Sequence, residues 1–332
     1  SGGRLLHAEV VDHYFGVPGS WNLKRCDNGA CGLIWQDPMV IGEDLPRAYR
    51  EYYTTTATNA EGVSSEVPFE ATFYRLERLA ARILRLADER RRFALAYLDH
   101  RRPGKLLDVG CGTGAFVAAM QRLGWEARGT DFDPIAAERA RTIHNISVDV
   151  GDLIQLRYEA ESLDAIALRH VIEHVYEPRE LVAECWRLLK PGGQLVFATP
   201  NAASLGHQHF GPRWRGLEQP RHLYLYDPRS MLALLERAGI SNAQVFSSAQ
   251  GAAYGLRGSF ATSRGVVRRC VDYAAIWWLQ IAETLLTRHG REVGEELIAI
   301  VRKPSADEEK TPAREPQTKM SFVKRSDQAS AT

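Results

Sequence analysis

The chain has 332 residues, 45% of them apolar and 25% charged, which is typical of a globular protein of one large or two moderate domains. A formal net charge of +1 excludes a strongly basic surface for nucleic acid or membranes, and five scattered cysteines argue against a disulfide framework. The longest apolar stretch, residues 273–286, is too short to span a bilayer, so we expect a cytoplasmic protein without a transmembrane segment.

Residues 1–60 contain a cysteine pair that resembles the second half of a zinc ribbon. Cys26 and Cys31 lie just before a glycine and an apolar segment, as in a zinc knuckle. Structural zinc needs four ligands, and the spacing of His7 and His13 is not typical of the missing two. We therefore predict a small, zinc-ribbon-like N-terminal module that is degenerate or truncated and holds no metal. The alternative is a hairpin with two buried cysteines.

The next segments predict a loop and then helices. Residues 47–65 are polar and rich in threonine, asparagine and serine, as expected for a connection between modules. Between residues 69 and 97 apolar side chains recur at helical spacing with arginines between them, so we assign helices to 66–100. These helices either cap a ligand cleft or only pack against the core.

A glycine-rich stretch begins the largest domain, which we place at 101–303. Leu106 to Val109 reads as a buried strand, and Gly110, Gly112 and Gly114 form a turn that leads into a helix. Such a turn lets a ligand approach the backbone and offers free N–H groups to an anionic group. The dinucleotide fingerprint also fits, but Asp108 would repel a pyrophosphate and attract an ammonium group.

Apolar strands alternate with amphipathic helices after this turn. This pattern predicts an α/β fold with a doubly wound, seven-stranded, mostly parallel sheet. Ligands of such sheets bind beyond the carboxyl ends of the strands, where Asp131 and Asp152 follow the second and third strands. The predicted strands lie near 105–109, 126–131, 146–150, 163–169, 193–199, 243–248 and 295–302, and the helices near 114–123, 134–143, 178–189 and 228–238.

The ordered motifs resemble those of the class I S-adenosylmethionine-dependent methyltransferases, which have a Rossmann-like fold. They are Leu107-Asp-Val-Gly-Cys-Gly-Thr-Gly114, Gly129-Thr-Asp-Phe-Asp-Pro134, Gly151-Asp152, Leu163-Asp-Ala-Ile-Ala-Leu-Arg-His-Val-Ile-Glu-His174 and Leu189-Lys-Pro-Gly-Gly-Gln-Leu-Val-Phe197. The resemblance implies that S-adenosyl-L-methionine binds with Asp108 at its methionyl end, Asp131 on the ribose, and Phe132 and Asp152 at the adenine. The full set implied to contact the cofactor is Asp108, Gly110, Cys111, Gly112, Gly114, Asp131, Phe132, Asp152, Leu153, Arg169 and His170.

Histidines after the fourth strand and in a later loop are the candidate catalytic bases. Histidine suits proton removal from a hydroxyl acceptor near neutral pH, so we nominate His170, His222 and His209. His170, Glu173 and His174 also match an inverted zinc-protease signature, which we reject because the segment belongs to a sheet. A metal held by these residues and His222 stays an alternative, although we predict none.

Residues 199–226 combine aromatic and polar side chains in a long connection, which is typical of a substrate loop. Trp214 can stack on a sugar face and Arg213, Arg215 and Arg221 can hold anionic groups. The segment resembles methyltransferases of bacterial polysaccharide and secondary-metabolite pathways, which implies a small, sugar-like acceptor. The alternative is a solvated loop in which Trp214 is a core anchor.

The last segments predict an insertion and a tail. Residues 250–294 replace a short link with an apolar helix, which we expect to pack on the core or on a homodimer mate through residues 270–290. Residues 304–332 are polar and proline-rich, and we expect them to be disordered.

We therefore predict transfer of a methyl group to a hydroxyl, or less readily a carbon, of a small acceptor. Nucleic-acid bases are disfavoured because Arg169-His170 stands where amine methyltransferases of that kind carry Asn/Asp-Pro-Pro-Tyr. The alternatives are a nicotinamide-dependent oxidoreductase and a non-catalytic cofactor-binding interaction protein.

Overall fold

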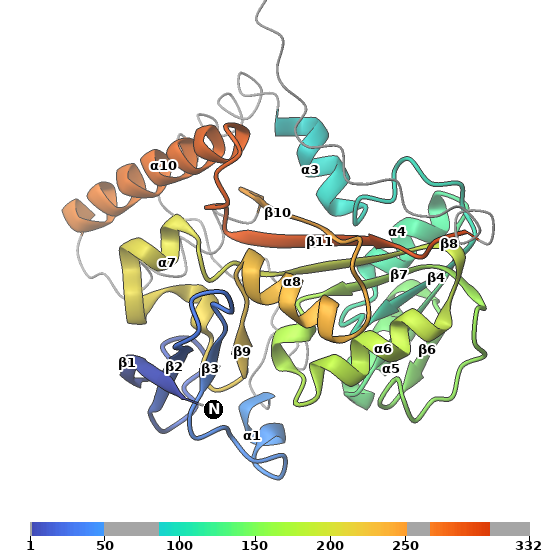
Figure 1. Cartoon of the computed structure of the whole chain (residues 1–332), viewed down its shortest axis with the longest axis horizontal. Coiled ribbons are helices and arrows are strands. Elements are labelled where there is room, and N and C mark those ends of the chain that lie inside the picture. Colours follow the sequence, from blue (N-terminus) through green and yellow to red (C-terminus); the bar gives the residue numbers. More distant parts are fainter. Residues whose placement is uncertain (1, 50–85, 251–265, 306–332) are drawn as a thin grey trace, which may run out of the picture.

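A seven-stranded sheet is the centre of the protein, whose computed structural model describes residues 2–49, 86–250 and 266–305. The strand order is β10-β11-β8-β7-β4-β5-β6 (Figure 1), with β11 antiparallel to both neighbours and the pairs from β8 to β6 parallel. This order confirms the predicted Rossmann-like α/β fold. The strands are β4 (Lys105–Val109), β5 (Glu126–Asp131), β6 (Val148–Val150), β7 (Leu163–Arg169), β8 (Leu189–Pro200), β10 (Gln244–Ser248) and β11 (Glu296–Arg302).

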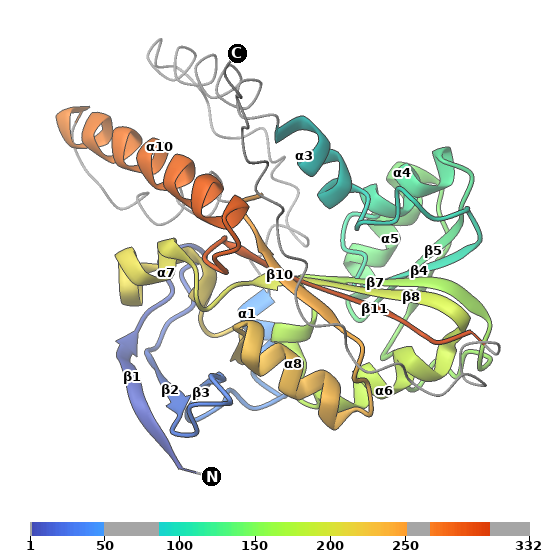
Figure 2. The ribbon, with the colours of Figure 1, turned by 45° about the horizontal axis from the view of Figure 1, so that its top comes forward.

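Helices cover both faces of this sheet, which is why its central strands are apolar throughout. Figure 2 shows α4 (Ala115–Arg122) and α5 (Pro134–His144) on one side and α6 (Pro178–Leu188) and α8 (Pro228–Arg237) on the other. Each helix pair packs on its own apolar cluster, and residues 165–168 of β7 are fully buried between the two clusters. Local signals set the helix starts: Asp133 caps α5, and Asp227 and Ser230 form a capping box at α8.

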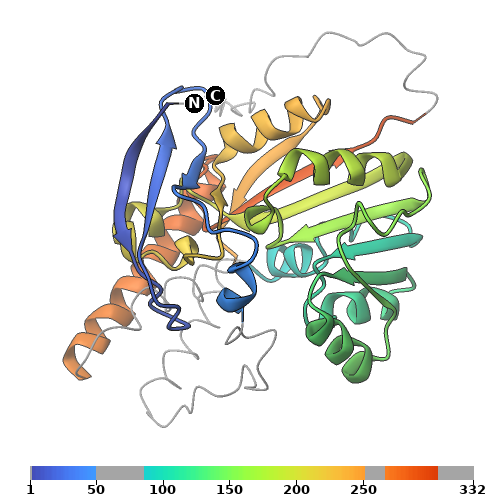
Figure 3. The same ribbon diagram turned by 90° about the horizontal axis from the view of Figure 1, so that it is seen from below.

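A second, smaller sheet joins the N-terminal segment to the large domain. Its order is β1 (Gly3–Val10), β2 (Trp21–Cys26), β3 (Ile34–Gln36) and β9 (Tyr224–Leu225), and the short helix α1 (Leu45–Tyr49) follows it. Leu23 and Ile34 are fully buried in one cluster with Trp214 and Leu225, so the two parts share a core. Figure 3 shows α1 between these strands and the large sheet. The module boundary at residue 60 stays a prediction.

The cysteines of the predicted zinc ribbon lie at the end of β2 and in the turn after it. Cys26 and Cys31 are both free thiols. The part of the chain that the structure describes has one group of side chains able to converge on an ion, and that group contains neither cysteine. The relation of this turn to a zinc ribbon therefore stays a prediction.

Three further segments complete the described structure. Residues 201–226 form α7 (Leu205–Phe210), the 3-10 turns η2 (Gly211–Arg213) and η3 (Arg215–Leu217) and then β9, while η1 (Ile172–His174) follows β7. Helix α3 (Leu86–Ala94) precedes β4, and α10 (Val266–Arg288) occupies the predicted insertion. In the described ranges no helix has the length and apolar character needed to cross a membrane. The predicted helix before residue 86, the start of the insertion at 251–265 and the tail after 305 lie outside the described residues.

Two buried carboxyl groups join α10 to β11. Glu283 accepts a hydrogen bond from the backbone N–H of Glu295, whose own carboxylate accepts from Trp214 Nε1 at 2.8 Å and from Gly206 N at 2.9 Å. Burial and then mutual repulsion raise the pKa of Glu283 well above its usual range, and burial raises that of Glu295 to about 7. The folded protein therefore tolerates these two buried carboxyl groups best while they are protonated and uncharged.

We predict that stability falls with rising pH because of this pair. A carboxyl with a raised folded-state pKa stabilises fully below its unfolded pKa of 4.5 and loses that contribution as pH rises through its folded value, about 7 for Glu295. For Glu295 alone the loss is about 3 kcal/mol. In Glu283→Gln the amide keeps the hydrogen bond without charge, so thermal unfolding between pH 5 and 9 should show a slope at least halved. The exposed Glu126→Gln is the control, and equal slopes in Glu283→Gln and wild type would contradict the prediction.

Candidate active site

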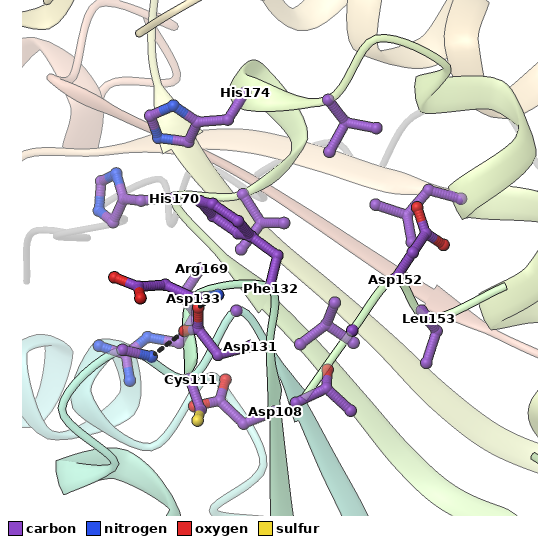
Figure 4. A pocket seen from close by; sticks show the side chains of 18 of the residues that line it. Asp108, Cys111, Asp131, Phe132, Asp133, Asp152, Leu153, Arg169, His170 and His174 are labelled. Carbon is purple, nitrogen blue, oxygen red and sulfur yellow. Dashed lines mark hydrogen bonds between the residues drawn. The ribbon is translucent and has the colours of Figure 1, made fainter. Parts of the chain in front are cut away.

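A cavity of about 610 Å³ opens at the carboxyl ends of β4, β5 and β7. Figure 4 shows Asp108 and Asp131 at its base, Asp152 and Leu153 along one side, and His170 and His174 at the opposite end from Asp108. The lining includes every residue expected to contact the cofactor except Gly114. These residues are Asp108, Gly110, Cys111, Gly112, Asp131, Phe132, Asp152, Leu153, Arg169 and His170.

The glycine turn lies between β4 and α4, and its three glycines all have positive φ. Gly110 and Gly112 have φ of 66° and 51°, which side chains rarely adopt, and both line the cavity. Gly114 has a different role from the one expected. It is the N-cap of α4 at φ 75°, and a Cβ there would lie 2.4 Å from Ile146 Cδ1. Its lack of a side chain allows close packing of α4.

The acidic groups at the base of the cavity are held in defined positions. Asp131 accepts hydrogen bonds from Gly112 N at 2.8 Å and Asp133 N at 3.0 Å, so the end of β5 is tied to the glycine turn. Asp108 is 4% exposed, and its burial raises its pKa to about 7 against the opposing effect of Arg169. The Arg169 guanidinium lies 4.6 Å from the Phe116 ring centroid, which fixes its place above α4. A ligand with an ammonium group would be paired by Asp108.

His170 lies between two acidic side chains. Its Nδ1 is 3.4 Å from Glu173 and its Nε2 is 3.6 Å from Glu296. Partial burial lowers the pKa of His170, but Glu296 and Glu173 outweigh that effect and raise it to about 9. His170 is therefore a cation at neutral pH and holds the proton that a general base must lack. Its φ of 55° is unusual for a side chain other than glycine.

Glu173, His174 and His222 form a separate cluster beside the cavity, with their ligand atoms within 4.8 Å of one another. His174 Nδ1 is 3.0 Å from Arg221 O, and His222 Nδ1 is 2.7 Å from Gly216 O. Because a carbonyl oxygen only accepts, both rings carry hydrogen on Nδ1, and the neutral form of each ring has its lone pair on Nε2. His174 lines the cavity, whereas His222 is 4% exposed behind it.

This cluster fits a divalent cation. Among the described residues the fully buried Glu173 carboxylate has the His170 Nδ1 at 3.4 Å as its ion-pair partner and no well-formed hydrogen bond, and the two imidazoles have the orientation that carbonyl partners give to metal-bound histidines. Burial raises the pKa of Glu173, but His170 and the other two histidines lower it to about 2, so the carboxylate is charged. A bound cation would lower the pKa of an acceptor hydroxyl. The predicted absence of a metal stays a prediction.

Several residues nominated from the sequence lie elsewhere. His209 is exposed on α7, and neither it nor His222 lines the cavity. Trp214, Arg215 and Arg221 are buried to 1%, 8% and 0% exposure, so this part of the loop between β8 and α8 packs inside the protein. The many polar residues of this segment could not show from the sequence whether it forms an exposed substrate loop or a set of buried, hydrogen-bonded side chains. Trp214 is buried, as expected for the alternative in which it anchors the core.

Other lining residues were not anticipated. Leu45 and Tyr49 come from α1, and Val171, Val175 and Tyr176 follow β7. Tyr49 belongs to the segment predicted as a polar connection. No local sequence pattern predicts its position at the cavity, because that position depends on the docking of the N-terminal segment. His174 was named only with the metal alternative, although its spacing from His170 was visible in the sequence.

The methyltransferase domain family matches residues 74–245, more than half of the chain. The chain belongs to this family, and its cofactor is S-adenosylmethionine. The match excludes the nicotinamide alternative, whereas a non-catalytic member of the family stays an alternative. The glycine turn, Asp108 and Asp131 line the cavity, and their contact with the cofactor stays a prediction.

Curated relatives share part of this domain. The ubiquinone biosynthesis O-methyltransferase of Pectobacterium atrosepticum is 33% identical over 117 residues, covering 32% of this chain and 48% of that protein. A probable S-adenosylmethionine-dependent methyltransferase of Mycolicibacterium smegmatis is 29% identical over 153 residues, covering 45% of this chain and 58% of that protein. The chain thus spans about half the length of the curated relatives it matches. Among solved structures, a SAM-dependent methyltransferase from Archaeoglobus fulgidus has a TM-score of 0.45 at 20% identity, covering 66% of this chain and 94% of that one.

We predict that cofactor affinity depends on the ionisation of Asp108. With a pKa of about 7 in the free protein, the carboxyl is protonated in acid and cannot pair with the cofactor ammonium group. The affinity for S-adenosylhomocysteine should therefore be constant above pH 8 and fall about tenfold per unit below pH 6. Asp108→Asn should bind weakly with little dependence on pH. Calorimetric titrations from pH 5 to 9 measure both, and a flat wild-type profile would remove this role from Asp108.

Proposed function

We propose that the protein transfers the methyl group of S-adenosylmethionine to a hydroxyl oxygen of a small acceptor. The observation that carries the proposal is the His174 imidazole, which lines the cofactor cavity and whose Nδ1 is held by Arg221 O, so that the neutral ring has its lone pair on Nε2. In the reaction the acceptor oxygen forms a bond to the methyl carbon and the carbon–sulfur bond breaks. The hydroxyl proton passes to a base, and S-adenosylhomocysteine leaves with the electron pair on sulfur.

The geometry favours His174 over the histidines nominated from the sequence. His170 is held as a cation by Glu173 and Glu296, His222 lies behind the cavity wall, and His209 is on the surface of α7. His174 Nδ1 is fixed by Arg221 O and Tyr49 Oη at 3.0 and 2.9 Å. We assign His174 as the proton acceptor and His222 as a residue that positions Glu173 and His174. Methyl transfer to carbon remains the less favoured reaction.

The acceptor is small and carries a hydroxyl group. The cavity wall near His174 is formed by Val171, Val175, Tyr176 and Leu45, which suits an uncharged molecule with apolar or ring surface. Several relatives are named ubiquinone biosynthesis O-methyltransferase, which supports oxygen as the methylated atom. A sugar-like acceptor stays a prediction, because the tryptophan and two of the arginines on which it was based are buried.

Self-association and location also stay predictions. Helix α10 has Trp278 at 71% exposure and Leu285 at 43%, which supports a homodimer through residues 270–290.

Methyl transfer can be tested with S-adenosylmethionine and a panel of phenols, catechols and free or nucleotide-linked sugars. Mass spectrometry should detect an acceptor with one added methyl group and an equal amount of S-adenosylhomocysteine. His174→Ala should lower turnover at least about tenfold with unchanged affinity for S-adenosylhomocysteine, because only proton removal is lost. His209→Ala is the matched control and should keep full turnover. Equal turnover of the His174 variant and wild type would exclude His174 as the base.

A second test asks whether the Glu173 cluster binds a cation. If the cluster is a metal site, the ion would occupy the His174 Nε2 lone pair and exclude His174 as the base, and protein dialysed against a chelator would take up one Mn²⁺ or Zn²⁺ ion per chain in a calorimetric titration, with a rise in unfolding temperature. Glu173→Gln should lose this uptake, because it removes the charged ligand without changing the shape of the site. Uptake that is the same in wild type and Glu173→Gln would place the ion elsewhere.

A further inference from the structure

Part of the cofactor cavity is lined by residues that lie outside the matched methyltransferase domain. Leu45 and Tyr49 of α1 line the cavity, yet both precede residue 74, where the match to the methyltransferase domain family begins. The Tyr49 side chain contacts residues that follow β5 and β7. This part of the lining is a property of the N-terminal segment of this chain.

Tyr49 contacts two other residues that line the cavity, Phe132 and His174. Its ring meets Phe132 edge to face at 5.5 Å between centroids, and its hydroxyl is 2.9 Å from His174 Nδ1. Phe132 is 57% exposed, so much of its surface stays open although Tyr49 packs against it. A large exposed aromatic side chain next to an apolar cavity is suited to a planar ligand ring.

Buried contacts hold α1 in this place. Arg221 is 0% exposed and donates to Ala48 O and to Asp12, both at 3.0 Å. The hydroxyl of Tyr176 donates to Val40 O at 2.7 Å, and β3 pairs with β9. Helix α1 is therefore fixed to the large domain by charge, by hydrogen bonds and by a shared sheet.

We propose that Tyr49 is a cofactor-binding residue and that α1 completes the adenosine side of the cavity. The inference rests on S-adenosylmethionine as the cofactor, with Phe132 beside the adenine. The Tyr49 ring holds Phe132 in the orientation that presents its face to the adenine and excludes water from that side. Its hydroxyl, which contacts His174, serves the acceptor side.

The test compares Tyr49→Ala with Tyr49→Phe in full-length protein. Titration with S-adenosylhomocysteine should show Tyr49→Ala weakened about three- to tenfold, the range that one aromatic pair contributes. Tyr49→Phe keeps the ring and should bind within about twofold of wild type. Leu45→Ala, from the same helix, should also bind more weakly and serves as the second variant if Tyr49→Ala does not fold. Ile41→Ala is the matched control, because Ile41 belongs to the same segment, is 58% exposed and is outside the cavity lining.

Each outcome separates this inference from the cofactor assignment. Wild-type protein without affinity for S-adenosylhomocysteine would overturn the assignment itself. Wild-type binding with no change in Tyr49→Ala and Leu45→Ala would overturn only the role of α1. Tighter binding by Tyr49→Ala would show that the ring occupies the place of the ligand, and equal weakening by Tyr49→Phe would assign the effect to the hydroxyl; both results would contradict the proposal.

Discussion

The buried guanidinium of Arg221 is the interaction on which the arrangement of the two sheets depends. It meets the buried carboxylates of Asp12 at 3.0 Å and Glu218 at 3.3 Å, and it lies 4.4 Å from the ring centroid of the half-buried Phe15. Removing one partner of such a pair leaves an uncompensated charge in the interior, at a cost of about 3–5 kcal/mol. The N-terminal segment and the loop before β9 are consequently one structural unit rather than a module on a tether.

The main chain around Arg221 extends this unit to the reaction end of the cavity. Arg221 O fixes the His174 ring, Leu223 N donates to Glu173 O at 2.8 Å, and the next two residues form β9. Residues 221–225 therefore hold the Glu173 cluster on one side and the N-terminal sheet on the other. The position of His174 relative to the cofactor is thus coupled to the docking of residues 2–49.

Local patterns predicted the fold well, because buried strands and capped helices are encoded within a few residues. The motif around Asp108 and Asp131 likewise places both side chains at strand ends, where they line the cavity. The roles of Trp214 and His222 could not be predicted in this way. Their surroundings come from segments far apart in the chain, such as Glu295 beside Trp214, and only tertiary packing shows that both are buried. The position of Tyr49 at the cavity could not be predicted for the same reason.

The charges around the cavity explain how one pocket can bind the cofactor and release its product. Asp108, Asp131, Asp133 and Asp152 line it, while Arg169 and the protonated His170 are its cationic members among the described lining residues. S-adenosylmethionine brings a positive sulfonium and a positive ammonium group into this acidic field, and the sulfonium charge disappears on methyl transfer. If the cofactor binds here as proposed, we expect the product, which has lost this charge, to bind less tightly than S-adenosylmethionine. The raised pKa of Asp108 agrees with this proposal. In the free protein the buried carboxylate lacks a cationic partner and is therefore unfavourable, and the ammonium group of the cofactor would supply that partner.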